Sequence, residues 1–314
     1  MTEHTYIIQL YALGSHNSFD ITEDQYHEIK QAHQFNEFGS AFEEKLDLIL
    51  MNYADLEREL LDMSLQHSIF RGSIHELLIE GMHRVNRRLI NLLTAIRLYQ
   101  DQVSHSLSTV YGNTSTNYAS FKTVMNKEYD DNLSYRAIEA IRNHVQHSSL
   151  PVTSIIFSED AVEKSPKDPK DYNQQIGFNV MPFIGIQYLE ADKKFKKNTL
   201  KELKGISSKS NNIELVPLVR QYISSVARIH TKVRNLCKDD LEFSENTITT
   251  FRKTAEEKLG HASEGLAAIQ CDSAGEFTEH VFLTNRPQKR WKSLQSKNIH
   301  LEQSSIRFVT SKHA

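Results

Sequence analysis

Two long segments of the chain carry apolar residues alternately three and four positions apart. The first, about 41–67, contains Phe42, Leu46, Ile49, Tyr53, Leu56, Leu60 and Met63, and the second, about 76–105, contains Leu78, Met82, Val85, Leu89, Leu92, Ile96, Tyr99 and Val103. Such spacing places an apolar seam along one side of an α-helix. The sequence between them, HSIFRGSIH, is short and contains Gly72. The pattern therefore predicts an antiparallel helical hairpin within a bundle, in preference to an extended coiled coil.

A third helix is predicted from about Leu133 to just before Pro151, after the polar stretch VYGNTSTNYAS. Proline cannot continue a helix, and the residue before it disfavours helical geometry. At about 100° per residue, Ala137, Ile138, Ile141 and Val145 form the apolar face. Roughly opposite lies a polar stripe of Glu139, Arg142, Asn143, Gln146 and His147, with His144 at its flank. The helix is thus amphipathic, with its polar groups concentrated near the C-terminal end.

The remaining patterns predict shorter elements around these three helices. A strand is expected at 6–13, a short helix at about 23–33 behind the Thr22–Gln25 capping box, and helices at 217–237 and from Ser244 to Gly260. Two β-like runs, 152–157 and 177–190, should pair with each other or with 6–13. The expected organisation is a strand and short helix in 1–40, a helical core in 41–151, a β insertion and basic loop in 152–200, helices completing the bundle in 201–260 and a weakly patterned tail in 261–314.

Composition narrows the class of protein. The chain is 39% hydrophobic and 25% charged, typical of a globular protein, and its formal net charge of −3 argues against non-specific coating of nucleic acid. A local basic cleft stays compatible with that charge. The sequence has no signal-peptide pattern and no apolar run long enough for a membrane span, so we expect a cytoplasmic protein with its two cysteines reduced. Fifteen histidines are scattered without the spacing of a metal site, so no metal or other cofactor is expected.

The stretch RNHVQH, residues 142–147, is open to two interpretations. Most polar stripes simply face water, and histidines in a last turn are favoured by the helix dipole. The stretch also resembles the R-x4-6-H motif of the HEPN superfamily, in which a polar residue, here Asn143, often follows the arginine. The resemblance extends over about 41–151, where two long helices precede the motif helix, with the helix at 217–237 completing the bundle. Both β-like runs lie outside it.

The resemblance implies a mainly α protein: a HEPN-like helical bundle with a small β-sheet or hairpin, α+β overall. Many HEPN proteins are metal-independent endoribonucleases. The resemblance therefore also suggests a role as a toxin or in phage defence. Others have lost catalysis and bind RNA, a nucleotide or a partner protein. HEPN ribonucleases commonly pair two motif helices across a homodimer, so a composite site between two copies is expected, with a protein regulator as a further candidate partner. Both the catalytic and the non-catalytic hypotheses stay open.

The residue types of the motif suit RNA transesterification. Histidine titrates near neutral pH, so His147 is the candidate acid/base. Arginine keeps its charge, so Arg142 is the candidate phosphate clamp, and Asn143 can donate to phosphate or orient the histidine. His144 and Gln146 are auxiliary candidates. Five positions of an ideal helix separate Arg142 from His147 by ~140°, so the two cannot both grip one small group from the centre of a free helix face. They could both line a cleft if a second helix packs alongside, or if the last turn distorts before Pro151.

RNA would also need docking charge. The candidates are Arg84, Arg87 and Arg88 on the second long helix, Lys196 and Lys197 in a basic stretch, and Arg290 with Trp291 in RPQKRWK. An aromatic ring among cations can stack on a base. The alternative for each is an ordinary solvated surface.

Overall fold

The computed structural model describes residues 4–12, 17–70, 74–161, 176–262, 264–299 and 301–306. Within them the protein is mainly helical with two small antiparallel sheets, α+β overall, which confirms the expected fold class. The chain forms two compact units. The first unit comprises residues 1–47, 102–121 and 231–299, and the second comprises 48–101, 122–230 and 300–314. The long helices contribute residues to both.

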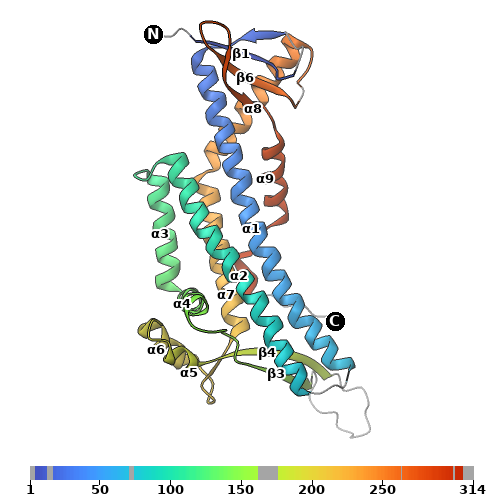
Figure 1. Cartoon of the computed structure of the whole chain (residues 1–314), viewed down its shortest axis with the longest axis vertical. Helices are drawn as coiled ribbons and strands as arrows, with labels where there is room; N and C mark the ends of the chain where they lie inside the picture. Colours follow the sequence, from blue (N-terminus) through green and yellow to red (C-terminus); the bar gives the residue numbers. More distant parts are fainter. Residues whose placement is uncertain are drawn as a thin grey trace. The chain divides into compact units, whose positions relative to one another are not determined.

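Most of the secondary-structure elements are helices (Figure 1). The helices are α1 (Glu23–Ile69), α2 (Ile74–Tyr111), α3 (Thr116–Asp131), α4 (Leu133–His147), α5 (Ile186–Ala191), α6 (Lys197–Ile206), α7 (Leu215–Leu236), α8 (Lys238–Leu259), α9 (Arg286–Lys297) and the 3₁₀ helix η1 (Leu301–Ile306). The strands are β1 (Thr5–Leu10), β2 (Ser18–Asp20), β3 (Ser154–Ala161), β4 (Ile176–Gly185), β5 (Asn212–Glu214), β6 (Leu266–Cys271) and β7 (Phe277–Phe282).

Helix α1 merges two helices that the sequence pattern separates. Its start is as expected, because the Gln25 N–H donates to Thr22 Oγ1 at 3.1 Å and the Thr22 N–H donates to Gln25 Oε1 at 2.9 Å. The break expected between 33 and 41 does not occur. Gly39 is the strongest helix-disfavouring residue there, and one glycine costs only about 1 kcal/mol. It serves close packing, since a Cβ at Gly39 would lie 2.7 Å from Leu241 Cδ2.

The first unit contains a four-stranded sheet in the order β2-β1-β6-β7. One face of the sheet packs on α1 and α8 through a core that includes Ile8, Tyr26, Ile29, Ile248 and Leu266. The expected strand at 6–13 is therefore present, but it pairs with β6 from the tail, where the sequence pattern predicts no regular element. Cys237 and Cys271 are both buried free thiols in this unit.

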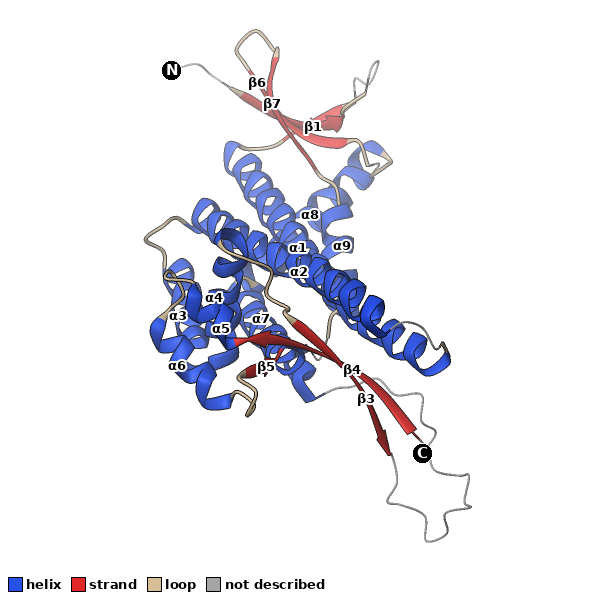
Figure 2. Cartoon of the chain, turned by 60° about the horizontal axis from the view of Figure 1, so that its bottom comes forward, coloured by secondary structure: helices blue, strands red, loops and turns tan. Residues whose placement is uncertain are grey.

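The second unit contains a three-stranded sheet in the order β3-β4-β5, drawn in red in Figure 2. Ser154 pairs with Phe183 and Ser158 with Asn179, so the predicted pairing of the two β-like runs with each other is confirmed. The prediction that the second run continues to 190 is wrong. After Gly185 the chain turns into α5, whose buried Ile186 and Leu189 have helical spacing.

Polar side chains tie the helices of the second unit together. The Arg220 guanidinium of α7 donates to both carboxylate oxygens of Glu57 on α1, at 2.8 Å each. Arg228 makes the same bidentate contact with Glu128 on α3. Helix α3 begins at Thr116, so the prediction that the stretch VYGNTSTNYAS is a polar link is wrong for its second half. Its anchor on α7 is 100 residues away along the chain, which a local pattern cannot reveal.

Two predicted helix boundaries are confirmed and one is wrong. Pro217 lies in the first turn of α7, as proline at a helix start should. Helix α8 ends at Leu259, directly before the predicted closing residue Gly260, which caps it with a left-handed φ of 76°. However, α8 begins at Lys238 and not at Ser244, because its first turn carries Asp239 and Asp240, which suit the positive end of the helix dipole.

Candidate functional site

Helix α4 positions the RNHVQH motif at its C-terminal end. Its buried residues include Ala137, Ile138 and Ile141, which confirms most of the predicted apolar face, whereas Val145 is only half-buried. The helix ends at His147, where the Ser148 N–H donates to the His144 carbonyl at 2.8 Å. The motif therefore lies on the last two turns of a helix whose opposite face is fixed by packing.

Arg142 is held beside Asn143 and Glu139. Its side chain is 12% exposed, and its Nη2 lies 3.3 Å from Glu139 Oε2. The same Nη2 donates to Asn143 Oδ1 at 3.0 Å. The Nε atom is buried and has no hydrogen-bond acceptor among the described residues. Arg142 and Asn143 are thus joined by a hydrogen bond, and the guanidinium keeps one donor, Nε, unsatisfied.

Glu139 is the centre of a polar network between helices, not a solvated residue of the predicted stripe. Its carboxylate is 15% exposed. Oε1 accepts a hydrogen bond from Gln100 Nε2 at 2.8 Å and another from the Tyr222 hydroxyl. Gln100 also donates to the Tyr135 hydroxyl at 3.0 Å. Burial and the Glu139 charge raise the pKa of Tyr222 well above its usual value, so this phenol stays a donor.

His144 is buried, which corrects its predicted place at the flank of the polar stripe. It is 2% exposed, its Nδ1 lies 2.8 Å from Asp192 Oδ2, and its Nε2 lies 2.9 Å from Ser149 Oγ. The hydrogen bond from His144 and one from the Lys194 backbone lower the pKa of Asp192. The contacts fasten the last turn of α4 to the chain segment that follows α5. His144 is therefore a structural residue of this helix end.

The other members of the motif face outward. Asn143, Gln146 and His147 are all exposed. His147 makes no hydrogen bond or ion pair within the described ranges. The structure thus brings Arg142 and Asn143 together and leaves His147 separate from them, on the same helix end.

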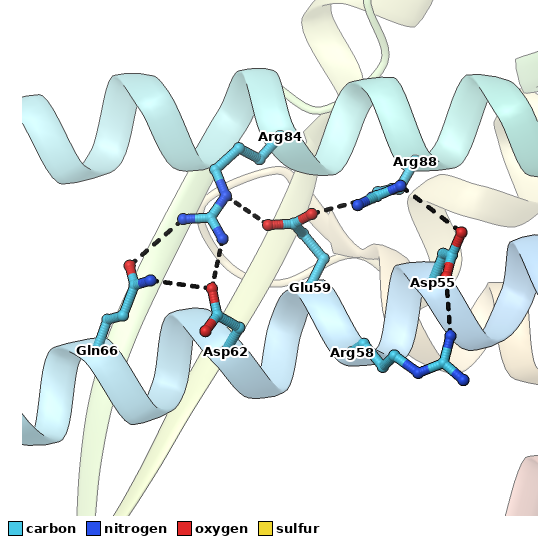
Figure 3. Close-up of polar contacts among 7 residues, drawn as sticks. All are labelled: Asp55, Arg58, Glu59, Asp62, Gln66, Arg84 and Arg88. Atoms are coloured by element: carbon cyan, nitrogen blue, oxygen red, sulfur yellow. Dashed lines mark hydrogen bonds and ion pairs between the residues drawn. The ribbon is translucent and has the colours of Figure 1, made fainter.

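Two of the three predicted docking arginines on α2 are engaged with α1. Figure 3 shows Arg84 and Arg88 reaching the same carboxylate, Glu59, which is only 5% exposed. Arg84 also contacts Asp62 at 2.6 Å, and Arg88 contacts Asp55 at 3.7 Å. These arginines join the two helices of the hairpin. Arg87, one position from Arg88, is exposed.

The remaining docking candidates differ in environment. Lys196 and Lys197 line a cavity of about 570 Å³ beside α6, together with Tyr129, Asp130, Arg136, Asn198, Thr199 and Glu202. Arg290 pairs with Glu44 at 3.0 Å on the surface of the first unit. Trp291 is 6% exposed, and its indole N–H donates to Asn36 at 3.4 Å. This burial corrects the prediction that Trp291 offers a ring for stacking.

The described residues were also compared with the requirements of a metal site and of a membrane-spanning helix. Over the described ranges, no three His, Cys, Asp or Glu side chains gather as ligands for a metal ion. None of the helices in the described part of the chain has the length and apolarity to cross a bilayer. Comparison with protein-family models, with curated proteins and with solved structures found no match for this chain.

Proposed function

We propose that this protein is a metal-independent endoribonuclease of the HEPN type, acting through Arg142 and His147. The observation that carries the proposal is the state of Arg142. Its guanidinium sits at the helix end that exposes His147, and its buried Nε has no acceptor among the described residues. An unsatisfied buried donor costs about 1–3 kcal/mol, and a rotation of the side chain toward solvent would let a phosphate oxygen satisfy it.

Arg142 and Asn143 are suited to hold the phosphate. The guanidinium keeps its charge at every physiological pH and can donate to two oxygens at once. Asn143 uses its carbonyl oxygen to accept from Arg142, which leaves its amide N–H groups for a second phosphate oxygen. Glu139 also contacts Nη2 and so helps to orient the guanidinium. A bound phosphate would approach from the solvent side, where Asn143 is exposed.

His147 is suited to move the protons. One histidine removes the proton of the 2′-hydroxyl, whose oxygen then bonds to the adjacent phosphorus while the bond to the 5′-oxygen breaks. The leaving 5′-oxygen takes its proton from water, and the hydroxide left behind takes up the proton that the histidine removed. The products are a 2′,3′-cyclic phosphate and a 5′-hydroxyl. Imidazole can take up this proton and release it again because it titrates near neutral pH.

In this proposal, His147 of one copy acts on the phosphate that Arg142 of another copy holds. Arg142 and His147 are ~140° apart around α4 and about 7.5 Å apart along its axis. A twofold assembly that faces two α4 ends would place the arginine of one copy beside the histidine of the other. A homodimer is therefore part of the proposed function. The HEPN resemblance favours a toxin or phage-defence setting, with a protein regulator.

A second candidate function is a non-catalytic module that binds RNA, a nucleotide or a partner protein. It is favoured by the contact between Glu139 and Arg142, because a carboxylate already neutralises part of the charge that would bind phosphate. The two functions differ in whether His147 is needed.

The test is incubation of purified protein with mixed RNAs, with and without a chelator. We expect cleavage in both conditions, products ending in 2′,3′-cyclic phosphate, and no cleavage of DNA, which lacks the attacking hydroxyl. His147→Ala should lower the rate by ~10²-fold or more. His83→Ala, an exposed histidine on α2, is the matched control and should keep full activity. RNA binding without cleavage would support the non-catalytic module.

A further inference from the structure

We propose that the cavity at the N-terminus of α6 binds a backbone phosphate of the RNA substrate. The choice of RNA rests on the proposed function, whereas the phosphate chemistry rests on the cavity itself. The cavity has a volume of about 570 Å³ and lies in the second unit. Its walls come from α3, α4 and the first turn of α6. Helices α4 and α6 pack against each other, so the cavity adjoins the helix that carries the motif.

The first turn of α6 supplies hydrogen-bond donors without partners. The first N–H groups of any helix lack an intrahelical acceptor. Here the N-cap is Lys196, which provides no side-chain acceptor. The backbone N–H groups of Lys197, Asn198 and Thr199 find no other acceptor within the described ranges, and all three residues line the cavity. Such a helix start favours an anion through its free donors and its dipole.

Thr199 is a second and independent indication of a ligand. It is only 2% exposed, yet it lines the cavity. Its hydroxyl has no hydrogen-bond partner among the residues that the structure describes. Thr199 Oγ1 is not among the described atoms that are both fully buried and unpaired, so the hydroxyl faces the space of the cavity, where a ligand can reach it. A phosphate oxygen at the helix start would accept from this hydroxyl and from the backbone donors together.

The charges around the cavity leave it positive. Arg136 is paired with Glu202, at 2.8 Å between Nη2 and Oε1, so these two largely cancel. Lys196 donates to the Tyr129 hydroxyl, which is neutral, and lies 4.6 Å from the centre of its ring. Lys197 adds a second exposed ammonium, and Asp130 adds one carboxylate. The positive charge of two ammonium groups and of the helix N-terminus therefore exceeds the negative charge of a single carboxylate.

The size of the cavity fits one nucleotide unit of a strand better than a lone inorganic ion. About 570 Å³ is in the range of small-ligand sites, whereas a phosphate group alone fills only a small part of it. Tyr129 is half-buried and lines the same cavity, so a sugar or base attached to the phosphate would meet an aromatic edge. One nucleotide of a single-stranded RNA can therefore bind in this cavity, beside α4.

The test measures binding without cleavage, by fluorescence anisotropy of a labelled single-stranded RNA. It uses full-length His147→Ala protein as the background, so that the RNA stays intact. Lys197→Gln and Thr199→Val should each weaken binding by about tenfold at low salt. Lys197→Gln should also reduce the slope of log affinity against log salt by about 0.7, the value for one contact to a single strand.

Lys201→Gln is the matched control. It removes the same charge from the same helix, and Lys201 is exposed and does not line the cavity. Its binding should stay within about twofold of the background protein. Thermal unfolding of all three variants confirms that they fold. If Lys197→Gln and Thr199→Val bind RNA as tightly as Lys201→Gln, the proposed site is refuted.

A mononucleotide, adenosine monophosphate, identifies the source of the phosphate. The proposal expects RNA to bind much more tightly than the mononucleotide and to be displaced only by high concentrations of it. The assignment to RNA would be overturned by a different pair of results. In that case the protein binds the mononucleotide tightly and Lys197→Gln abolishes this binding, but Lys197→Gln does not change RNA binding. Loss of binding in the site variants with no RNA cleavage by wild-type protein would support this site and refute the proposed enzyme.

Discussion

His144 and His147 lie three positions apart in one helix turn and have opposite environments. His144 is 2% exposed between Asp192 and Ser149, whereas His147 is exposed and has no partner in the described part of the chain. The sequence places both in the same polar stretch and cannot separate them, because Asp192 is 48 residues away. Tertiary contacts thus give His144 a structural role, whereas the imidazole of His147 stays accessible to a substrate.

The contact between Asp192 and His144 makes the stability of this helix end depend on pH. A carboxyl whose folded pKa is depressed contributes stability above its unfolded value, about 3.9, and loses it as the pH falls through the folded pKa. Asp192→Asn should therefore lower the free energy of unfolding by about 1–3 kcal/mol at pH 7. The difference from wild type should shrink below about pH 4. Urea denaturation at pH 7 and at pH 3.5 measures it, and a pH-independent difference would contradict this role.

Glu139 should contribute to stability through three neighbours at once. Gln100 and Tyr222 donate to its carboxylate, and Arg142 pairs with it. Glu139→Gln replaces a charged acceptor by a neutral one and should cost about 1–3 kcal/mol of unfolding free energy. Glu190→Gln removes the exposed pair with Lys204 and should cost less than about 1 kcal/mol. Equal losses in the two variants, in urea denaturation, would show that the network adds nothing.

At the scale of elements, the hairpin of α1 and α2 is joined by charge as well as by apolar seams. Glu59 is buried between Arg84 and Arg88, which themselves are 24% and 32% exposed (Figure 3). Removal of one partner from a buried pair is costly, because the other charges lose their compensation. Arg84 and Arg88, which the sequence pattern predicts to dock RNA, thus have a role in helix packing.

Glu59→Ala should lower the free energy of unfolding by about 3 kcal/mol, because two arginines lose their shared carboxylate. Arg58→Ala is the control on the same helix. Arg58 is 64% exposed and pairs with Asp55 at the surface, so its removal should cost less than about 1 kcal/mol. Chemical denaturation monitored by circular dichroism compares the two. A Glu59→Ala protein as stable as Arg58→Ala would refute a structural role for the cluster.

The sequence predicts elements well where one face is buried and poorly elsewhere. The seams of α1 and α2 and the apolar face of α4 have clear helical spacing, and their positions are confirmed. Strand β6 is buried on both faces, from Leu266 to Ile269, so it has no alternation to reveal it. Helix α3 buries only Phe121 completely, so its apolar periodicity is weak. In the site, Arg142 and Asn143 are found from the motif, but the partners on α2, on α7 and directly after α5 come only from the fold.

At the scale of the whole molecule, the proposed function needs two copies of the chain. A single α4 cannot bring Arg142 and His147 to one phosphate, since they point ~140° apart. Light scattering should therefore report about twice the chain mass of 36.2 kDa at micromolar concentration. A monomer at every accessible concentration would remove the composite site from the proposal.

The central claim is that Arg142 of one copy and His147 of the other act on the same phosphate. The most direct test mixes two inactive variants, Arg142→Ala and His147→Ala, under conditions in which dimers exchange subunits. In random mixing about half of the dimers are mixed, and each mixed dimer has one intact site of two, by twofold symmetry. We predict that RNA cleavage returns to about a quarter of the wild-type rate, with 2′,3′-cyclic phosphate ends. Mixed dimers that form but cleave no faster than either variant alone would contradict the claim.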